Sequence, residues 1–482
     1  MTASLSTYVA GNKFGLGLRP GERQLIASDP RNWLRQQLKD IARVPAAFSN
    51  VEPSDKLVLE AVQGLRKLKQ GVDAVQAGKA SSNQQTSDAR AQQLRQQVID
   101  GEKSIRQAQR EQLMARLQHS FATETPFAER LVRFWSNHFT VAEGGGVKRA
   151  LRVIAVPYEN EAIRTRLNGN FADLLLAVEQ HPAMQIYLDN FQSIGGDSRA
   201  NRNGKRGLNE NLAREILELH TLGVDGGYTQ QDVTTLARII TGWTVGGIGP
   251  NPRLQANPGR FLYVDVMHEP GTQRLLGNSY RDNGVDQGKQ ALRDLAQHPA
   301  TARHIAVKLA RHFVADQPPP AAIDKLETTF RDTHGHLPSV HAALIELDAA
   351  WDENNRKLKT PEELVISLGR GLNLGSVMQG NQRNKGALLI QALTTFGQTP
   401  FSAPSPAGWS DLAEFWGNPD ALLKRIEFAT AVAERIPPER EVLAIYADLL
   451  PQQPKLVVEI SRAATTSQAL ALLVASPQFQ WR

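Results

Sequence analysis

The sequence contains no cysteine at any of its 482 positions. Disulfide bonds, thiolate metal sites and a cysteine nucleophile are therefore excluded. Cysteine-free proteins occur on both sides of a membrane, so this absence shortens the list of chemistries without assigning a compartment.

Long hydrophobic runs are also missing. No stretch of about 18 apolar residues occurs, so we expect no transmembrane segment. The opening MTASLSTYVAGNKFG lacks the basic start and the apolar stretch of a secretory signal. A cytoplasmic protein is the default expectation, and export stays open because a signal removed before residue 1 would leave no trace.

An excess of one charge is slight. The formal net charge is +6 and the isoelectric point about 9.4, which is little over this length. No basic stripe stands out, and the most motif-rich helix is acidic, so we expect no nucleic-acid partner. A 41% hydrophobic and 22% charged composition is typical of a soluble globular protein.

Familiar catalytic signatures are lacking as well. The sequence has no HExxH metal motif, no phosphate-binding loop and no nucleophile elbow. What it does contain is one stretch dense in carboxylates, Arg, His and glycine, from Leu208 to Trp243: LNENLAREILELHTLGVDGGYTQQDVTTLARIITGW.

The first half of this stretch predicts an amphipathic helix over residues 209–223 with an acidic polar face. Asn209 is expected to cap its start, and Gly223 to end it in the left-handed conformation. A second helix is expected from about Thr229. The unit should therefore be a helix, a glycine turn and a helix.

Ten residues in and around this unit form the candidate site. They are His138, Asn209, Glu210, Arg214, Glu215, Glu218, His220, Asp232, Arg238 and His268. Glu215 and Glu218 suit paired carboxylates or metal ligands, to which His138 or His268 would add nitrogen, so a divalent metal is one expected cofactor. The alternative is a buried ion-pair network, which the alternation of acidic and basic residues along the helix favours. Under either interpretation the ten should converge.

Two further segments carry charge in a pattern. His304, Lys308, Arg311 and His312 share one face of a helix predicted over 300–313, which suits either pairing with the acidic helix or binding of an anion. Thr360-Pro361-Glu362-Glu363 has the pattern of a helix start, so we expect an architectural role there.

The fold class that these patterns predict is mainly α: a large multi-helix body with one small β-hairpin around residues 243–277. In that hairpin, Phe261–Val266 alternates like a strand and is followed by a tight connection to Arg274–Leu276. It would deliver His268 to a loop edge.

The chain is expected to form a single helical unit over 1–482. Within it we predict a helical hairpin arm, rich in Gln and charge, at 46–119, a motif-bearing core at 120–320 and a C-terminal helical part at 321–482. The second arm helix, from Asp88 to His119, carries few large apolar residues, which suits a projecting, solvated helix or a partner-binding arm.

Several segments together resemble the bacterial family called domain of unknown function 1800, nearly from end to end. They are FGLGLRPGE (14–22), RFWSNHFTV (133–141), HPAMQIYLDN (181–190), the stretch 208–243, KTPEELVISLGRGL (359–372), FGQTPFSAPSPAGW (396–409) and SPQFQWR (476–482). One departure is His268-Glu269, where the family more usually reads His-Asp. The resemblance implies a neighbour, because members often occur beside the family called domain of unknown function 1501, which resembles alkaline phosphatases and sulfatases.

Two classes of function follow. The first is a hydrolase, or an enzyme of phosphoryl or sulfuryl transfer, that uses the carboxylate, His and Arg cluster on the helix 209–223. The second is a non-catalytic helical binding or assembly module that works with a phosphatase-like or sulfatase-like partner of the family 1501. The Gln-rich arm and the Trp-rich segment 396–416 favour the second, because both offer surface for a partner.

Overall fold

The computed structural model describes residues 3–482 except 65–83, 203, 205–206, 249–253, 375–382, 436–440 and 452. Helix makes up 64% of the structure, and the strands in the described residues form two small antiparallel sheets of two strands each. The prediction of a mainly α fold is confirmed. Among the described residues, no helix is both long and apolar enough to cross a membrane.

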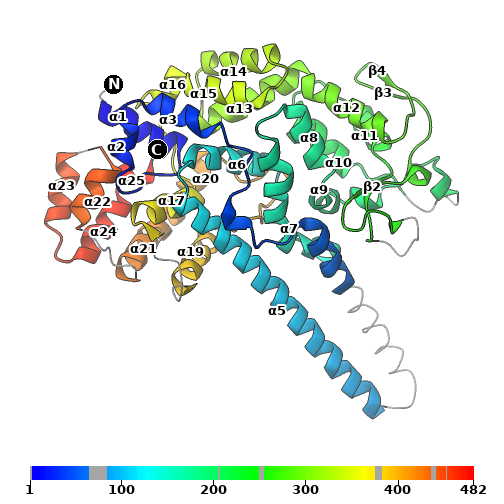
Figure 1. Ribbon diagram of the computed structural model, residues 1–482, viewed down its shortest axis with the longest axis horizontal. Helices are drawn as coiled ribbons and strands as arrows, with labels where there is room; N and C mark the ends of the chain where they lie inside the picture. The colour runs from blue at the N-terminus through cyan, green and yellow to red at the C-terminus, as the bar shows by residue number, and fades with distance from the viewer. Residues whose placement is uncertain are drawn as a thin grey trace.

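The helices follow one another in three groups (Figure 1). The first holds α1 (Ala3–Tyr8), α2 (Glu22–Ile26), α3 (Pro30–Gln37), α5 (Gln84–Ala122), α6 (Pro126–His138), α7 (Leu151–Tyr158), α8 (Phe171–Glu179), α9 (Pro182–Tyr187), α10 (Asn211–Glu215) and α11 (Gln230–Ile239). The second holds α12 (Val285–Gln297), α13 (Pro299–Phe313), α14 (Pro320–Asp332), α15 (Leu337–Ile345), α16 (Asp348–Trp351) and α17 (Pro361–Gly371). The third holds α19 (Arg383–Thr395), α20 (Ala413–Trp416), α21 (Pro419–Arg435), α22 (Val442–Leu449), α23 (Pro454–Ser461), α24 (Thr466–Ala475) and α25 (Pro477–Gln480).

Helix α6 lies at the centre of the body because one side of it is almost wholly apolar. Phe127, Leu131 and Trp135 are fully buried, as the spacing of three and four predicts. Trp135 also donates its indole N–H to His341 over 3.1 Å. One continuous cluster of buried apolar side chains runs from Val9 to Phe479, so α6 shares its core with segments from both ends of the chain.

The first and last described segments lie side by side (Figure 1). The hydroxyl of Tyr8 donates to the carbonyl of Trp481 over 2.9 Å, and Arg482 donates to the backbone oxygen of Lys13. Arg482 also exchanges backbone hydrogen bonds with Lys357. The two segments therefore stabilise each other directly.

Helix α5 leaves the body as a projecting arm (Figure 1). It is unbroken over 39 residues. Only its C-terminal part packs against the body, where Arg116, Leu117 and Phe121 are buried, whereas most described side chains from 92 to 111 are exposed. The expected first helix of the arm is seen at residues 54–64, and the rest of it falls within 65–83, outside the described residues.

The β structure differs from the predicted hairpin. Strand β2 (Phe261–Tyr263) pairs with β1 (Trp243–Val245), and β3 (Gln273–Leu275) pairs with β4 (Asn278–Tyr280). The predicted pairing of the first segment with Arg274–Leu276 is therefore wrong. Trp243 is fully buried against the core, and this burial draws β2 to β1 instead.

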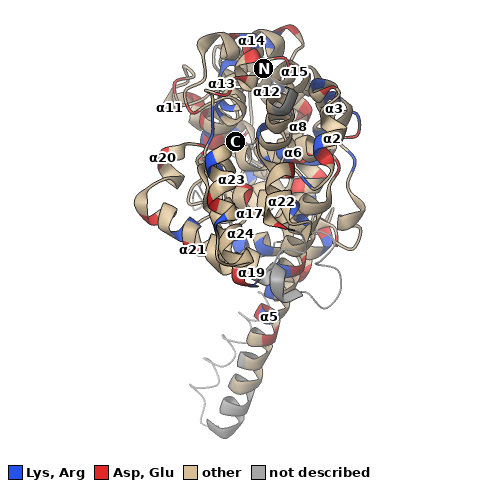
Figure 2. Cartoon of the chain, turned by 90° about the vertical axis from the view of Figure 1, so that its left-hand side faces the viewer, with Lys and Arg blue, Asp and Glu red and all other residues tan. Residues whose placement is uncertain are grey.

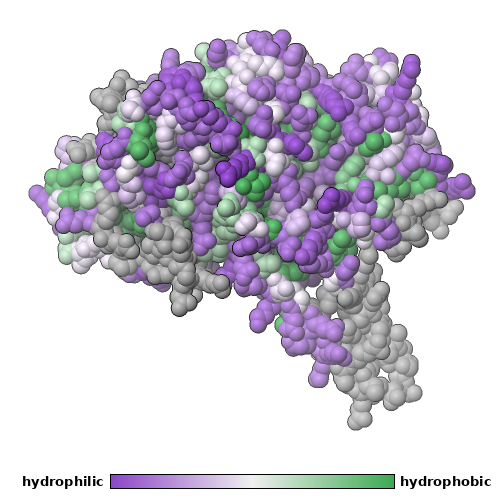
Figure 3. Space-filling model, viewed as in Figure 1, coloured by the Kyte–Doolittle hydropathy of each residue, from purple (hydrophilic) through white to green (hydrophobic). Residues whose placement is uncertain are grey.

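The surface mixes both signs of charge. Lys and Arg alternate with Asp and Glu over the face shown in Figure 2. Apolar side chains appear as small separate patches between hydrophilic ones in Figure 3. Among the exposed apolar residues, Phe415, Leu422, Leu423 and Ile426 come from the neighbouring elements α20 and α21.

Candidate functional site

The predicted helix over 209–223 is shorter and of two kinds. It begins at Asn211 as α10, and the segment Ile216–His220 continues it as a π-helix, η8. Asn209 accepts the N–H of Asn211 over 2.8 Å but does not cap in the usual position. The predicted stop at Gly223 is confirmed by its φ of 88°. Because a π turn is wider than an α turn, His220 becomes fully buried and Leu219 only half-buried, which reverses the predicted order.

Two of the ten predicted residues meet in the core. His138 lies within hydrogen-bonding distance of the backbone oxygen of His220, at 3.2 Å, and the two imidazole centroids are 6.2 Å apart. His220 in turn binds Glu179, a fully buried carboxylate, at 2.8 Å. Burial first, and then the charges of Lys308 and His304, lower the pKa of His138 well below its usual value. These contacts describe a buried polar chain rather than an open site.

Glu210 and Arg214 meet on the surface. Their side chains are 3.3 Å apart, and both bind Gln230 of α11 at 2.8 Å. Glu210 also accepts from Thr234. This network joins α10 to α11 and leaves its members largely exposed.

The other predicted residues have different partners. Asp232 caps α11 together with Thr229 and accepts the N–H of Leu276, while Glu218 accepts from Tyr228. Arg238 is half-buried. The buried His268 lies 3.0 Å from the backbone oxygen of Thr241.

Glu215 is half-buried on η8's approach, and burial raises its pKa. The expected convergence into one cluster is thus not what the contacts show: His138 and His220 pair in the core, and Glu210 and Arg214 on the surface. Within the described part of the chain, no group of three or more His, Asp or Glu side chains is placed to hold a metal ion.

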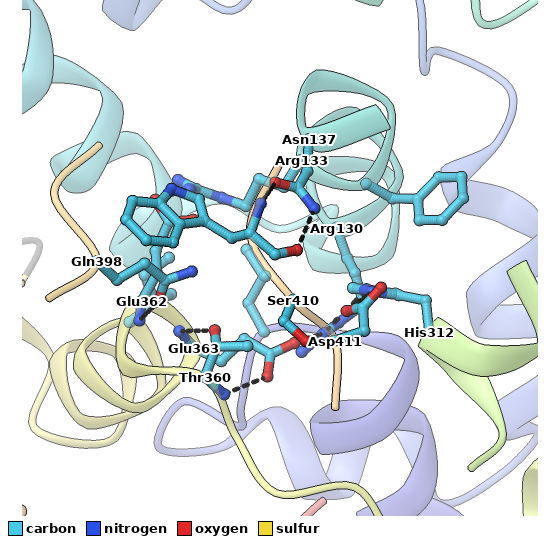
Figure 4. Close-up of a pocket in the computed structure, with 14 residues that line it drawn as sticks. Arg130, Arg133, Asn137, His312, Thr360, Glu362, Glu363, Gln398, Ser410 and Asp411 are labelled. Atoms are coloured by element: carbon cyan, nitrogen blue, oxygen red, sulfur yellow. Dashed lines mark hydrogen bonds and ion pairs between the residues drawn. The ribbon is translucent and has the colours of Figure 1, made fainter. Parts of the chain in front are cut away.

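The structure places a cavity elsewhere, between α6, α13, α17 and the segment 396–416 (Figure 4). We call it the Trp409 cavity. Its volume is about 70 Å³. The side chains that line it are Leu16, Arg130, Arg133, Phe134, Asn137, His312, Thr360, Glu362, Glu363, Ile366, Gln398, Trp409, Ser410 and Asp411.

Carboxylates at the start of α17 hold the arginines of this cavity. Glu362 binds Arg116 and Arg133, each at 2.5 Å. Burial would raise the pKa of Glu362, yet the two guanidinium groups outweigh it and lower the pKa to about 2. Glu363 binds Arg482 at 2.9 Å and Arg130 still more closely, so its pKa is also well below the usual value. The predicted cap is present too, because Thr360 and Glu363 form a capping box.

A histidine and an aspartate face each other at one wall. Nδ1 of His312 lies 2.7 Å from Oδ1 of Asp411, and Nε2 lies 3.5 Å from the guanidinium of Arg130. Burial would raise the pKa of Asp411, but His312 lowers it to about 2. Burial also lowers the pKa of His312, against the pull of Asp411. A charged carboxylate therefore orients a neutral imidazole.

Asn137 fixes the segment above the cavity to α6. Its amide donates to the carbonyl of Trp409 over 2.9 Å and accepts the N–H of Trp409 over 2.7 Å. This approach needs glycine at the preceding position. Gly408 has a φ of 80°, and a Cβ there would lie 2.4 Å from the backbone oxygen of Asn137.

The comparison with known families decides the relationship. The family model described as "Protein of unknown function (DUF1800)" matches residues 10–481. The chain belongs to the DUF1800 family. It matches no curated protein and no solved structure.

In this DUF1800 protein, segments that carried the resemblance build the Trp409 cavity. Leu16, Asn137, Glu363 and Trp409 come from four of them, and Arg482 of a fifth binds Glu363. Sequence reasoning assigned Glu362 and Glu363 to architecture only. It named His312 without its partner and missed Asp411, Arg116, Arg130 and Glu179. The signal available was the joint appearance of these segments in one resemblance, which spacing within each segment does not convey.

Proposed function

We propose that the Trp409 cavity is an active site for hydrolysis, or for phosphoryl or sulfuryl transfer, in which His312 accepts a proton. The observation that carries this is the contact of His312 Nδ1 with Asp411 at the cavity wall. The N–H at Nδ1 donates to the carboxylate, so Nε2 keeps its lone pair for an attacking water or hydroxyl. Asp411 would then stabilise the imidazolium that forms.

The walls suit a small anionic group. A volume of about 70 Å³ holds roughly five water-sized groups, at about 10–15 Å³ for each, which is the size of a phosphate or sulfate group. Arg130 and Arg133 lie three apart on α6 and both line the cavity. A guanidinium has five N–H donors, so the bond of each to a carboxylate leaves donors for an anion. In this proposal the chemistry inferred from the sequence is kept, and its place moves from the helix 209–223 to the cavity.

Replacing His312 by glutamine tests the proposal. With p-nitrophenyl phosphate and p-nitrophenyl sulfate as substrates, we expect kcat/KM to fall about 10²- to 10⁴-fold, the usual contribution of a general base. A base must be neutral to act. Because burial lowers the pKa of His312, the acid side of the pH profile should lie below pH 6.5, with activity rising as pH increases towards that value.

Glu215→Gln is the matched control, because it neutralises a half-buried carboxylate of the motif helix outside the cavity. Its activity should stay within about threefold of wild type. Failure of the wild type to turn over either ester, or an equal loss in Glu215→Gln and His312→Gln, would exclude His312 as the base.

A second candidate, a binding module for a protein of the family 1501, is favoured by the projecting α5. Ile99 is 58% exposed on this arm. If the arm contacts the partner, Ile99→Asp should weaken binding of a purified family 1501 protein at least about tenfold, since buried apolar contacts dominate interfaces. Val224→Asp, at a body residue that is 67% exposed, should leave the Kd unchanged. Equal Kd values for both variants, measured by calorimetry, would remove the arm from the interface.

A further inference from the structure

A second cavity lies where the first and last segments meet, and a buried lysine lines it. We call it the Lys13 cavity. Its volume is about 50 Å³, and its walls include Tyr8, Lys13, Asn355, Trp481 and Arg482. Lys13 is 2% exposed and lies in the π-helix η1 (Val9–Phe14). The cavity shares no lining residue with the Trp409 cavity.

The amine of Lys13 has an unusual set of neighbours. Its Nζ donates to the backbone oxygen of Asn355 over 2.5 Å, and no carboxylate of the described residues lies within ion-pair distance of it. Other buried cations of the body, such as Lys357 and Arg370, each bind a carboxylate. A lysine buried without such a partner is most stable as the neutral amine.

The electrostatic surroundings act in the same direction. Burial, followed by the charges of Arg482 and Lys357, lowers the pKa of Lys13 to about 7, and Asp352 opposes this only in part. About half of the Lys13 side chains are then uncharged at pH 7, against about one in 2,500 for an ordinary exposed lysine. An uncharged amine is the nucleophilic form.

We propose that the Lys13 cavity is a covalent site at which Lys13 captures a small aldehyde or keto acid as an imine. Nζ attacks the carbonyl carbon, so a C–N bond forms and then becomes a double bond. The carbonyl C–O bond breaks, and the oxygen leaves as water with the two amine hydrogens. No oxidant or other reactant is needed. The volume sets the class of ligand, because about 50 Å³ holds three to five water-sized groups and thus a molecule of two to five heavy atoms.

Trapping the imine tests this directly. The full-length protein is treated at pH 7 with limiting glyoxylate and cyanoborohydride, and the modified lysines are located by peptide mass spectrometry. Lys13 should be modified about tenfold faster than the exposed Lys39 and Lys455. The ratio is smaller than the ratio of neutral fractions, because an amine of lower pKa is also intrinsically less nucleophilic.

Lys359 provides a matched control within the same chain. It is 1% exposed and burial lowers its pKa to about 7, but it does not line the cavity and its Nζ lies over the ring of Phe479. It should stay unmodified while Lys13 reacts. Modification of Lys13 no faster than that of Lys39, or equal modification of Lys359, would overturn the proposal. Both readouts use the wild-type protein, so neither depends on whether Lys13→Met folds.

Discussion

Replacing Arg370 by methionine is expected to lower the free energy of unfolding by about 3–5 kcal/mol, the usual cost of breaking a buried ion pair. Arg370 is completely buried and joins three segments. Its guanidinium donates to Glu22 over 2.9 Å, to the carbonyl of Gly17 over 2.7 Å and to those of Ser120 and Thr123 over 3.0 Å. Methionine fills a similar space but leaves a buried carboxylate and three carbonyls without donors.

Urea unfolding followed by circular dichroism measures this loss. Arg303→Met is the control, because Arg303 binds Asp324 and Glu327 on the surface and is 46% exposed. An exposed pair of this kind contributes at most about 1 kcal/mol. The double variant Arg370→Met with Glu22→Gln should recover part of the loss. Arg370→Met within about 1 kcal/mol of wild type would show that water replaces the guanidinium.

Acid is expected to destabilise the protein steeply between about pH 4.5 and pH 2. The folded-state pKa values of Glu362 and Asp411 are both about 2, below the ordinary values of 4.5 and 3.8, because Arg133, Arg116 and His312 outweigh the effect of burial. A lowered folded-state pKa means that the stabilisation is complete above the unfolded pKa and is lost as pH falls through the folded one. For Glu362 alone the loss is on the order of 3 kcal/mol.

The measurement is the free energy of unfolding in urea at pH 5 and pH 2.5. Glu362→Gln should be less stable than wild type at pH 5, and its stability should fall by on the order of 3 kcal/mol less between the two pH values. Glu346→Gln is the control, since Glu346 pairs with Arg31 and Arg35 on the surface. A wild type equally stable at both pH values would show that the α17 carboxylates are not preferentially ionised in the folded state.

Elements that depend on neighbours in sequence could be predicted well. Pro30 and Pro361 start helices, with side-chain caps from Asp29 and Thr360. The aromatic spacing of α6 identified a buried helix, and the glycine at 223 a left-handed stop. Each of these rests on interactions within one turn of the chain, which composition and spacing specify.

Two local features escaped because tertiary packing decides them. A π turn at 216–220 has no signature in an even amphipathic pattern, since it is stabilised by what it buries, here His220 against Glu179. The strand at 261–263 alternates correctly but pairs with Trp243–Val245 rather than with the segment that follows it. Periodicity predicts a strand and does not choose its partner.

The Trp409 cavity could not be predicted for a related reason. Arg133 and Glu362 are 229 positions apart, and His312 and Asp411 are 99 apart. Nothing in the spacing of either segment indicates such a pair. Density of charge along one helix directed attention to residues 209–223, where the polar side chains mostly form caps and surface pairs.

The contact between the first and last segments also bears on how the chain folds as it is made. Tyr8 and Lys13 reach their native partners only when Trp481 and Arg482 have left the ribosome. At about 5–20 residues per second, the interval between the two events is roughly 20 to 90 s. Until then the apolar residues of the first helices lack part of their native cover, and the chain is a substrate for chaperones throughout nearly its whole synthesis.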